Sequence, residues 1–348
     1  MRFSKSFNVV GIHCEGEVGN VIVGGLGQIP GESMLDKRNF LAENRDWIRK
    51  MILSEPRGQV ARNANIILPS SNPDADAGYI ILESIEYPVM SGSNTICVAT
   101  VLLETGMVEV HEPITRLNLE SPAGIIPVEC QVSDGKVTSV RFTNQPAFVY
   151  ELNAKVEVAG LGTFGVDVAW GGMTYFIIGA KELGFEIVPD EARDICAVME
   201  QIKTAAAQQI PVTHPIHPEF PGISVGVLAG SVENIAGVKT SKNTVVVSPG
   251  RLDRSPCGTG TSARMAVMHA RGELEVGERF VHTSIIDSTF DCRIESTTTV
   301  GGKDAIVPSI AGQAWITEFS TMVLDPSDPY PAGYRLTDTW PKGLDFGL

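Results

Sequence analysis

The chain lacks the features of proteins that bind nucleic acid or cross membranes. Lys and Arg total 27 against 41 Asp and Glu, a formal net charge of −14, and no basic run offsets this excess locally. Such a charge repels nucleic acid and anionic membrane surfaces. No apolar run approaches the roughly 20 residues that span a bilayer, and the N-terminal stretch has no apolar signal core. We therefore expect a cytoplasmic protein with no nucleic-acid or membrane partner.

Cysteine patterns typical of zinc sites and disulfide frameworks are also missing. The six cysteines show no Cys-x-x-Cys spacing and no dense cluster. In a chain of this length without an export signal, such cysteines are expected to be free thiols, most of them small core residues. A reactive cysteine must therefore be identified from its neighbours.

Two further patterns resemble metal or cofactor sites only superficially. Residues 214–219 read His-Pro-Ile-His-Pro-Glu, but the prolines prevent a helix that would align the two histidines. The Gly-rich stretches 24–27 and 160–165 do not stand between a strand and a helix, as dinucleotide binding requires. We expect no metal and no cofactor, and one of the two histidines is expected to line a pocket.

The length and the hydrophobic pattern predict two α+β domains. A chain of 348 residues suits two domains of roughly 150–170 residues each. Short apolar runs alternate with Gly, Pro, Asn and Asp, which predicts strands of about five residues joined by turns. Few segments have helical character: 35–52, 94–105, 178–183, 191–207 and 261–271. The first of these is expected to be a surface amphipathic helix. The mixture favours antiparallel-rich α+β domains over a doubly wound parallel sheet.

Two segments of the chain, 90–106 and 256–272, align with each other without a gap. Ser91 falls on Cys257, Gly92 on Gly258 and Ser93 on Thr259. Each segment has a small nucleophile-type residue, a Gly, polar residues, about ten helical residues and a closing Gly, which is a helix with a Gly C-cap. The agreement favours an internal duplication. Both helices are apolar on nearly all sides, so each is expected to be the buried axis of its own half.

The start of such a helix suits chemistry beside a carboxylate. Its free N–H groups and positive dipole end can bind a carboxylate and stabilise the charge that builds up when the adjacent carbon is deprotonated. The same position is expected to lower the pKa of Cys257 and make it a base. Asp253, four residues earlier, suits a substrate ammonium, or is an ordinary turn residue. Ser91 is a much weaker base, and is either an ordinary N-cap or a proton relay or acid.

Residues 252–266 resemble the second catalytic motif of the proline racemase family. They read Leu-Asp-Arg-Ser-Pro-Cys-Gly-Thr-Gly-Thr-Ser-Ala-Arg-Met-Ala. Similarity extends over most of the chain, including Gly16-Glu17 after His13, Asp167 with Gly171-Gly172, and Ser288-Thr289-Phe290. The family includes proline racemases, 4-hydroxyproline 2-epimerases and trans-3-hydroxy-L-proline dehydratases. The chain resembles most the dehydratase branch with a Ser/Cys active site.

This resemblance implies the fold of diaminopimelate epimerase and a cofactor-independent enzyme. The fold has two pseudo-twofold-related α/β domains, each with a mixed, barrel-like sheet around a central helix. We expect one domain to comprise residues 1–157 and about 326–348 and to carry Ser91. The other is expected to comprise 158–325 and to carry Cys257, with the active site in the cleft between them. A homodimer is left open.

The resemblance also assigns roles to single positions. Gly92, Ser93, Gly258 and Thr259 would hold the substrate carboxylate, with Asn94 in the same binding set, and Asp253 would hold the ring nitrogen. The first motif of racemases and epimerases in the family reads Met-Cys-Gly-His-Asn, whereas residues 90–94 here read Met-Ser-Gly-Ser-Asn. The Cys and the His of that motif are both replaced.

The replacement of Cys by Ser91 favours elimination over racemisation. Two-base racemisation needs comparable bases on both faces of the ring, whereas dehydration needs one. We therefore expect a trans-3-hydroxy-L-proline dehydratase that gives pyrroline-2-carboxylate, with 2-epimerisation as a plausible side activity. The alternatives are a 4-hydroxyproline 2-epimerase or proline racemase, and a non-catalytic protein that binds proline analogues. A thiol hydrolase built on Cys257 has no local signature.

Overall fold

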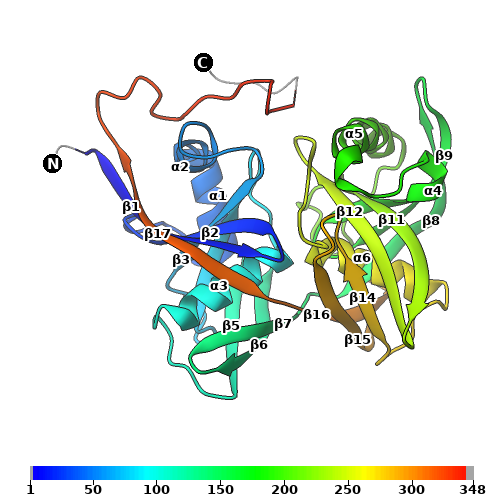
Figure 1. Cartoon of the computed structure of the whole chain (residues 1–348), viewed down its shortest axis with the longest axis horizontal. Coiled ribbons are helices and arrows are strands. Elements are labelled where there is room, and N and C mark those ends of the chain that lie inside the picture. Colours follow the sequence, from blue (N-terminus) through cyan, green and yellow to red (C-terminus); the bar gives the residue numbers. More distant parts are fainter. Residues whose placement is uncertain (1–2, 342–348) are drawn as a thin grey trace. The chain divides into compact units, whose positions relative to one another are not determined.

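The computed structural model describes residues 3–341, which form two compact units. The first unit contains the residues up to Phe142 and those from Gln313 on, and the second is Thr143–Gly312. The expected boundaries near residues 157 and 325 therefore differ from the observed ones. β8 (Ala147–Val158) belongs to the second unit because it pairs with β9 and β16. β17 (Ala314–Leu324) returns to the first unit, beside β1 (Figure 1).

The first unit contains one mixed sheet of eight strands. Its order is β17-β1-β2-β3-β4-β5-β6-β7, with β2–β3 and β4–β5 parallel and the other neighbours antiparallel. The remaining bounds are β1 Lys5–Cys14, β2 Glu17–Gly24, β3 Arg62–Leu68, β4 Ala77–Leu82, β5 Ile114–Ser121, β6 Gly124–Ser133 and β7 Lys136–Thr143. The short apolar runs 79–82, 117–119 and 137–142 of the sequence lie within these strands, and the run 21–25 lies within β2 up to Gly24.

The second unit repeats this arrangement. Its order is β8-β9-β10-β11-β12-β14-β15-β16, with β10–β11 and β12–β14 as the parallel pairs. β16 also pairs with β8, which closes the sheet into a barrel. The short strand β13 (Arg251–Leu252) turns back and pairs antiparallel with the end of β12. The other bounds are β9 Gly162–Trp170, β10 Thr174–Gly179, β11 Ile223–Ile235, β12 Val238–Val247, β14 Arg279–Thr283, β15 Thr289–Val300 and β16 Lys303–Gly312.

The helices occupy matching places in the two units. In the first, α1 (Met34–Asn44) and α2 (Trp47–Leu53) follow the third strand in the order, and α3 (Gly92–Glu104) follows the fifth. In the second, α4 (Ala180–Leu183) and α5 (Ala192–Gln209) follow the third strand, and α6 (Gly258–Ala270) follows the fifth and the short strand β13. The same strand order, strand senses and helix positions recur, as an internal duplication predicts. The fold is the mixed α/β fold expected from the sequence.

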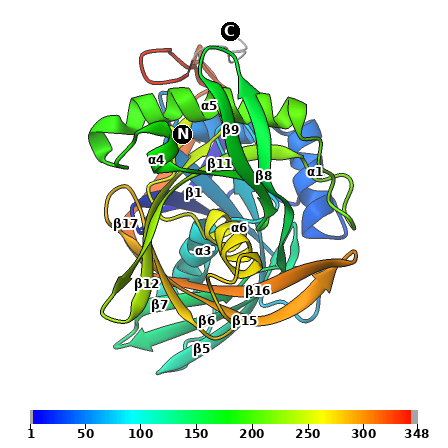
Figure 2. The same cartoon turned by 90° about the vertical axis from the view of Figure 1, so that its right-hand side faces the viewer.

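The central helices α3 and α6 are buried, as their apolar composition predicts. Every residue of α3 from Gly92 to Leu103 is buried, and α6 is buried on nearly all sides. Figure 2 shows α6, coloured yellow, among the strands of its barrel. No helix within residues 3–341 is long and apolar enough to cross a membrane.

The segment expected to be one surface helix over residues 35–52 is two helices that help to form a core. The first ends at Asn44 and the second starts at Trp47, and Arg49 pairs with Asp46 at the break. Met34 and Leu41 are buried against β3 and β4, as are four apolar residues of α2: Ile48, Met51, Ile52 and Leu53. The mixed charges of this segment suggested a surface helix. Because the chain breaks between the two helices, each of them packs apolar residues against the sheet.

Candidate active site

Cys257 stands at the N-terminus of α6 in a strained backbone conformation. Its φ of 64° and ψ of 109° lie where a side chain with a Cβ is rarely found. The residue is 6% exposed, and its Sγ accepts the N–H of Gly260 at 3.4 Å. A Cβ at position 260 would lie only 3.3 Å from this sulfur and 3.1 Å from Val245 Cγ2. The second glycine of Cys-Gly-Thr-Gly, Gly260, therefore leaves room for the thiol over the helix end.

Two buried hydroxyl groups complete the surroundings of the sulfur. Tyr175 on β10 places its OH 3.5 Å from Cys257 Sγ and 2.6 Å from Thr259 Oγ1. Thr259 Oγ1 lies 3.7 Å from the same sulfur. Because the two hydroxyls bond each other, one of their protons remains to stabilise a thiolate here, in addition to the Gly260 N–H. Burial raises the pKa of the Tyr175 hydroxyl, so that it stays protonated and able to donate.

Asp253 shapes the loop that leads to Cys257. Its Oδ1 accepts the backbone N–H of Ser255 at 2.8 Å and the Ser255 hydroxyl at 2.9 Å. Ser255 Oγ in turn accepts the N–H of Cys257 at 3.1 Å. Asp253 is 7% exposed, so it is a buried carboxylate, and its bond to the Ser255 N–H closes a turn. Its charge lies close enough to act on the thiol.

The expected lowering of the Cys257 pKa is wrong. Burial first, and then the negative charge of Asp253, raise the pKa of the thiol above its usual value. The hydrogen bonds from Tyr175, Gly260 and Thr259 act in the opposite direction but are outweighed. The position at the helix end is visible in the sequence, whereas the desolvation that outweighs it depends on tertiary packing.

Ser91 occupies the equivalent position on α3 with a different environment. Its backbone is extended, with φ −150° and ψ 123°, and its side chain makes no N-cap hydrogen bond. Its Oγ instead accepts Nδ2 of Asn94 at 2.9 Å. Asn94 is buried and accepts Nδ2 of Asn65 from β3 at 2.7 Å. The side chain of Asn94 therefore acts on Ser91, whereas the sequence placed Asn94 in the substrate-binding set.

One helical turn further along, each central helix is tied to its own sheet by a threonine. Thr95 Oγ1 lies 2.6 Å from the hydroxyl of Tyr79 on β4. Thr261, its counterpart on α6, lies 2.8 Å from Nδ1 of His282 on β14. All four side chains are fully buried. The threonine is common to both helices, whereas its partner is a tyrosine in one unit and a histidine in the other. The two copies have therefore diverged in the partner and kept the threonine.

Close packing of glycine positions α6 in its barrel. A Cβ at Gly171 would lie 2.2 Å from Thr259 O and 2.5 Å from Ala263 N, so only glycine fits. Asn144 Nδ2 bonds the Gly171 carbonyl at 2.7 Å and Ser262 Oγ at 2.9 Å. Gly171, the first residue of the Gly171-Gly172 pair, therefore allows the start of α6 to pack closely against it.

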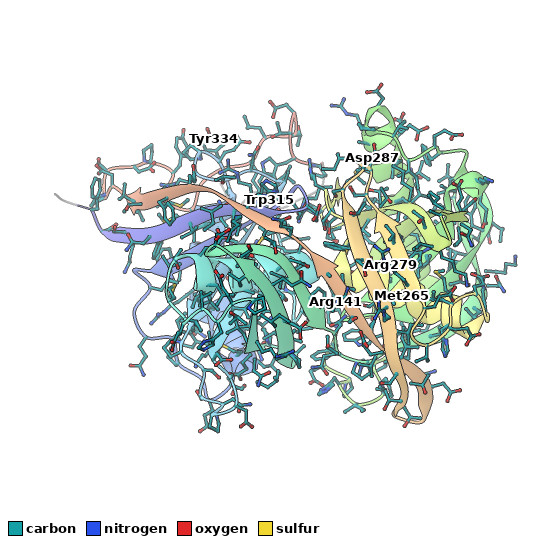
Figure 3. All side chains as sticks on the ribbon, turned by 60° about the horizontal axis from the view of Figure 1, so that its bottom comes forward. Arg141, Met265, Arg279, Asp287, Trp315 and Tyr334 are labelled. Atoms are coloured by element: carbon teal, nitrogen blue, oxygen red, sulfur yellow. The ribbon has the colours of Figure 1, made fainter. Side chains whose placement is uncertain are left out.

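The N-terminal signature residues have structural roles in the first unit. His13 Nδ1 accepts the N–H of Gly16 at 3.1 Å within the turn between β1 and β2. The His13 ring stacks on Trp315 of β17 at 5.3 Å between centroids; Figure 3 labels Trp315 on that strand. Glu17 accepts Nδ2 of Asn63 on β3 at 2.9 Å. These contacts tie the turn to both neighbouring strands.

The histidines at 214 and 217 belong to an aromatic cluster. His214 is 7% exposed and packs edge-on against Trp170 and Phe148, with ring centroids 4.7 and 5.4 Å away. Burial lowers its pKa to about 4, so it is neutral near pH 7. A cavity of about 740 Å³ in the second unit lies instead along Ala266, His269 and Ala270, at the end of α6 remote from Cys257.

The structure thus brings the expected residues together in two groups. Ser91, Gly92, Ser93 and Asn94 share the start of α3, and the other group, at the start of α6, contains Asp253, Cys257, Gly258 and Thr259. None of the six cysteines, all of which lie within residues 3–341, forms a disulfide bond.

Three residues at the two helix starts are not among those expected from the sequence: Asn65, Tyr175 and Ser255. Tyr175 lies close to the family-like Gly171-Gly172, and Ser255 lies inside the second motif, but Asn65 has no signal in the sequence. It belongs to a strand far from either motif along the chain and reaches Asn94 only through the sheet.

A protein-family model described as proline racemase matches residues 9–335. The chain belongs to the proline racemase family. A hydroxyproline epimerase from Agrobacterium vitis, solved with bound trans-4-hydroxy-L-proline, is 36% identical with a TM-score of 0.91, and the match covers 98% of each chain. A probable proline racemase from Agrobacterium radiobacter K84, solved with bound carbonate, is 36% identical with a TM-score of 0.90, covering 96% of this chain and 98% of that one.

More distant structures share the fold alone. Methylitaconate Δ-isomerase is 15% identical with a TM-score of 0.54, and the match covers 92% of this chain and 96% of that one. The fold is therefore that of the proline racemases and related isomerases. The protein is an enzyme of a family of cofactor-independent racemases and epimerases.

Proposed function

We propose that the enzyme is a trans-3-hydroxy-L-proline dehydratase with weak 2-epimerase activity. The observation that supports this proposal is that the side chains at the two helix starts, and the hydrogen bonds they receive, differ. Cys257 Sγ contacts a backbone N–H and two buried hydroxyls, whereas Ser91 is a hydroxyl whose oxygen receives one amide N–H. A thiolate is a competent base and a serine hydroxyl is not. One strong base suits elimination better than inversion.

The substrate has a carboxylate, which suits the two helix starts, and a ring ammonium, which suits Asp253. The free N–H groups at the starts of α3 and α6, next to Gly92, Ser93, Gly258 and Thr259, would bind the carboxylate. Asp253 would bind the ring ammonium. A bound ammonium would offset the negative charge of Asp253, which is the second cause of the raised Cys257 pKa. Substrate binding would thus move the thiol toward the thiolate that it needs.

The elimination can be completed by Cys257 itself. In trans-3-hydroxy-L-proline the α-hydrogen and the 3-hydroxyl both lie on the ring face opposite the carboxylate. The Cys257 thiolate takes the α-proton, the electron pair forms the Cα–Cβ double bond, and the C3–O bond breaks. The new S–H lies on the leaving group's face and gives its proton to the departing hydroxyl, which leaves as water. The thiolate is regenerated, and the enamine tautomerises to pyrroline-2-carboxylate.

A 4-hydroxyproline 2-epimerase is the second candidate. It is favoured by the 36% identity with an epimerase that was solved with trans-4-hydroxy-L-proline. In this reaction Ser91 would have to exchange a proton on the second ring face. A non-catalytic binding protein is disfavoured because such a protein would not require the strained backbone and the converging donors at Cys257.

Proton NMR in D₂O separates the three candidates with trans-3-hydroxy-L-proline, trans-4-hydroxy-L-proline and L-proline as substrates. Loss of the C3 hydroxymethine signal with imine formation supports the dehydratase. Deuterium at C2 with inversion, and with the hydroxyl kept, as the main reaction would support the epimerase instead. No change in any substrate would contradict both enzymatic functions. Cys257→Ala is the control, and it should abolish each observed reaction.

A further inference from the structure

Three side chains of the first unit form a continuous hydrogen-bonded chain that ends at Ser91. Asn65 Nδ2 donates to the Gly19 carbonyl at 3.1 Å and to Asn94 Oδ1 at 2.7 Å. Asn94 Nδ2 donates to Ser91 Oγ at 2.9 Å. The chain starts on a backbone group of β2, passes through β3 and reaches the first turn of α3. Its members come from three separate parts of the sequence.

The direction of this chain follows from the group that anchors it. A backbone carbonyl can only accept a hydrogen bond, so Asn65 must turn its NH₂ group toward Gly19. The same NH₂ then faces Asn94, which must present its oxygen to Asn65 and its NH₂ to Ser91. Turning both amides over would place Asn65 Oδ1 against the Gly19 oxygen, with two acceptors facing each other. The amide polarity at Ser91 is thus set at Gly19.

Packing holds the two asparagines in this arrangement. Asn65 is fully buried and Asn94 is 1% exposed. A Cβ at Gly19 would lie 2.7 Å from Asn94 Oδ1, so the glycine makes room for the amide. Oδ1 of Asn65 is buried and has no hydrogen-bond partner in the described part of the chain. One unsatisfied buried acceptor is unfavourable, but the two hydrogen bonds that Nδ2 donates hold the amide in this orientation.

We propose that Asn65 is a positioning residue that makes Ser91 a proton donor to the substrate. An N–H directed at Ser91 Oγ stabilises the negative charge left on that oxygen when its proton departs. It also occupies an oxygen lone pair, so the hydroxyl proton points away from Asn94. Resting on the proposed function, this assigns Ser91 to protonation of the α-carbon on the face opposite Cys257. Inversion then depends on Asn65, whereas elimination, carried by Cys257, does not.

The test compares inversion with dehydration in the Asn65→Asp variant. A carboxylate of the same shape can only accept, so the Asn94 amide must turn and present its oxygen to Ser91. We expect the rate of trans-4-hydroxy-L-proline inversion, relative to trans-3-hydroxy-L-proline dehydration, to fall about tenfold or more. Lowering the pH through the pKa of the introduced carboxyl should restore a donor and raise the ratio again. The ratio cancels the protonation of Cys257, which both reactions share.

Asn63→Ala is the matched control. Asn63 is an equally buried asparagine on β3, but its amide bonds Glu17 and not Asn94. The control should leave the ratio within about twofold of wild type, and Asn65→Ala should lower the ratio as Asn65→Asp does but without pH-dependent recovery. Thermal unfolding of each variant identifies any that fail to fold, and the ratio is read from those that do.

The outcomes distinguish this inference from the proposed function. An unchanged ratio in a folded Asn65→Asp variant overturns the role of Asn65, and so does a wild-type enzyme without any inversion activity. If wild type inverts but does not dehydrate, the proposed function fails. Inversion by the Asn65 variants relative to Asn63→Ala then still tests the role of Asn65: a selective loss supports it and an equal rate overturns it.

Discussion

Replacing Tyr175 with Phe removes one hydroxyl from the surroundings of the Cys257 sulfur. That hydroxyl lies 3.5 Å from Sγ and 2.6 Å from Thr259 Oγ1, and it is fully buried. It either donates to the sulfur directly or orients Thr259 to do so. The ring itself stays in place, so the substitution changes hydrogen bonding and leaves the packing nearly intact.

The size of the effect follows from the loss of one hydrogen bond to a charged sulfur. Such a bond contributes about 1.5–3 kcal/mol, and one pKa unit corresponds to about 1.36 kcal/mol. The Cys257 pKa, which burial and Asp253 already raise, should increase further by about 1–2 units. Below that pKa the thiolate fraction rises with pH. At a fixed neutral pH, kcat/KM should therefore fall about 10- to 100-fold, and the pH profile should move to higher pH.

The assay is the pH dependence of kcat/KM for loss of the α-proton, together with the alkylation rate of Cys257 by iodoacetamide. A matched control is Tyr79→Phe. Tyr79 makes the same type of buried contact, 2.6 Å to Thr95 Oγ1, and burial raises its pKa in the same way. The Tyr79→Phe variant should lose a similar amount of stability, but its pH profile of kcat/KM should stay as in wild type. If Tyr175→Phe leaves both the midpoint and kcat/KM as in wild type, the hydroxyl does not stabilise the thiolate.

Three further substitutions test other parts of the site. Ser91→Cys supplies a second thiol and should raise 2-epimerisation relative to dehydration in D₂O NMR; a constant ratio would refute the role given to Ser91. Asp253→Asn removes a charge that raises the Cys257 pKa, so alkylation should begin at lower pH while KM rises about tenfold or more. A lower KM would exclude ammonium binding there. Gly171→Ala places a Cβ 2.2 Å from Thr259 O and should cost about 1–3 kcal/mol or more, measured by thermal unfolding. An unchanged Tm would show that α6 can shift freely.

The fold was largely predictable because its signals are local. Alternating apolar runs and turn residues predicted the strands, and two apolar helices of matching sequence predicted two buried axes. The boundaries of the units were not predictable. β17 joins the first unit by pairing with the distant β1, and β8 joins the second through the neighbouring β9 and the distant β16; no linker composition marks either change. The break between α1 and α2 was missed for a similar reason, because it depends on packing against β3 and β4.

The candidate site was predictable only where its residues are adjacent in the chain. Asp253, Cys257 and Thr259 stand in one motif, and their relation to the start of α6 follows from helix geometry. Tyr175 and Asn65 reach the two helix starts across a sheet, and a single sequence carries no signal for such contacts.

By itself, the sequence determined the duplicated plan and the residue type at the head of each central helix. Helix and strand periodicity, glycine and capping chemistry all act over a few residues and can be read along the chain. The tertiary structure alone decided the ionisation of Cys257 and the hydrogen-bond polarity at Ser91. Desolvation depends on everything that packs around a group, and amide orientation depends on the carbonyl at the far end of a chain of contacts. Both are therefore set by residues that are distant in sequence.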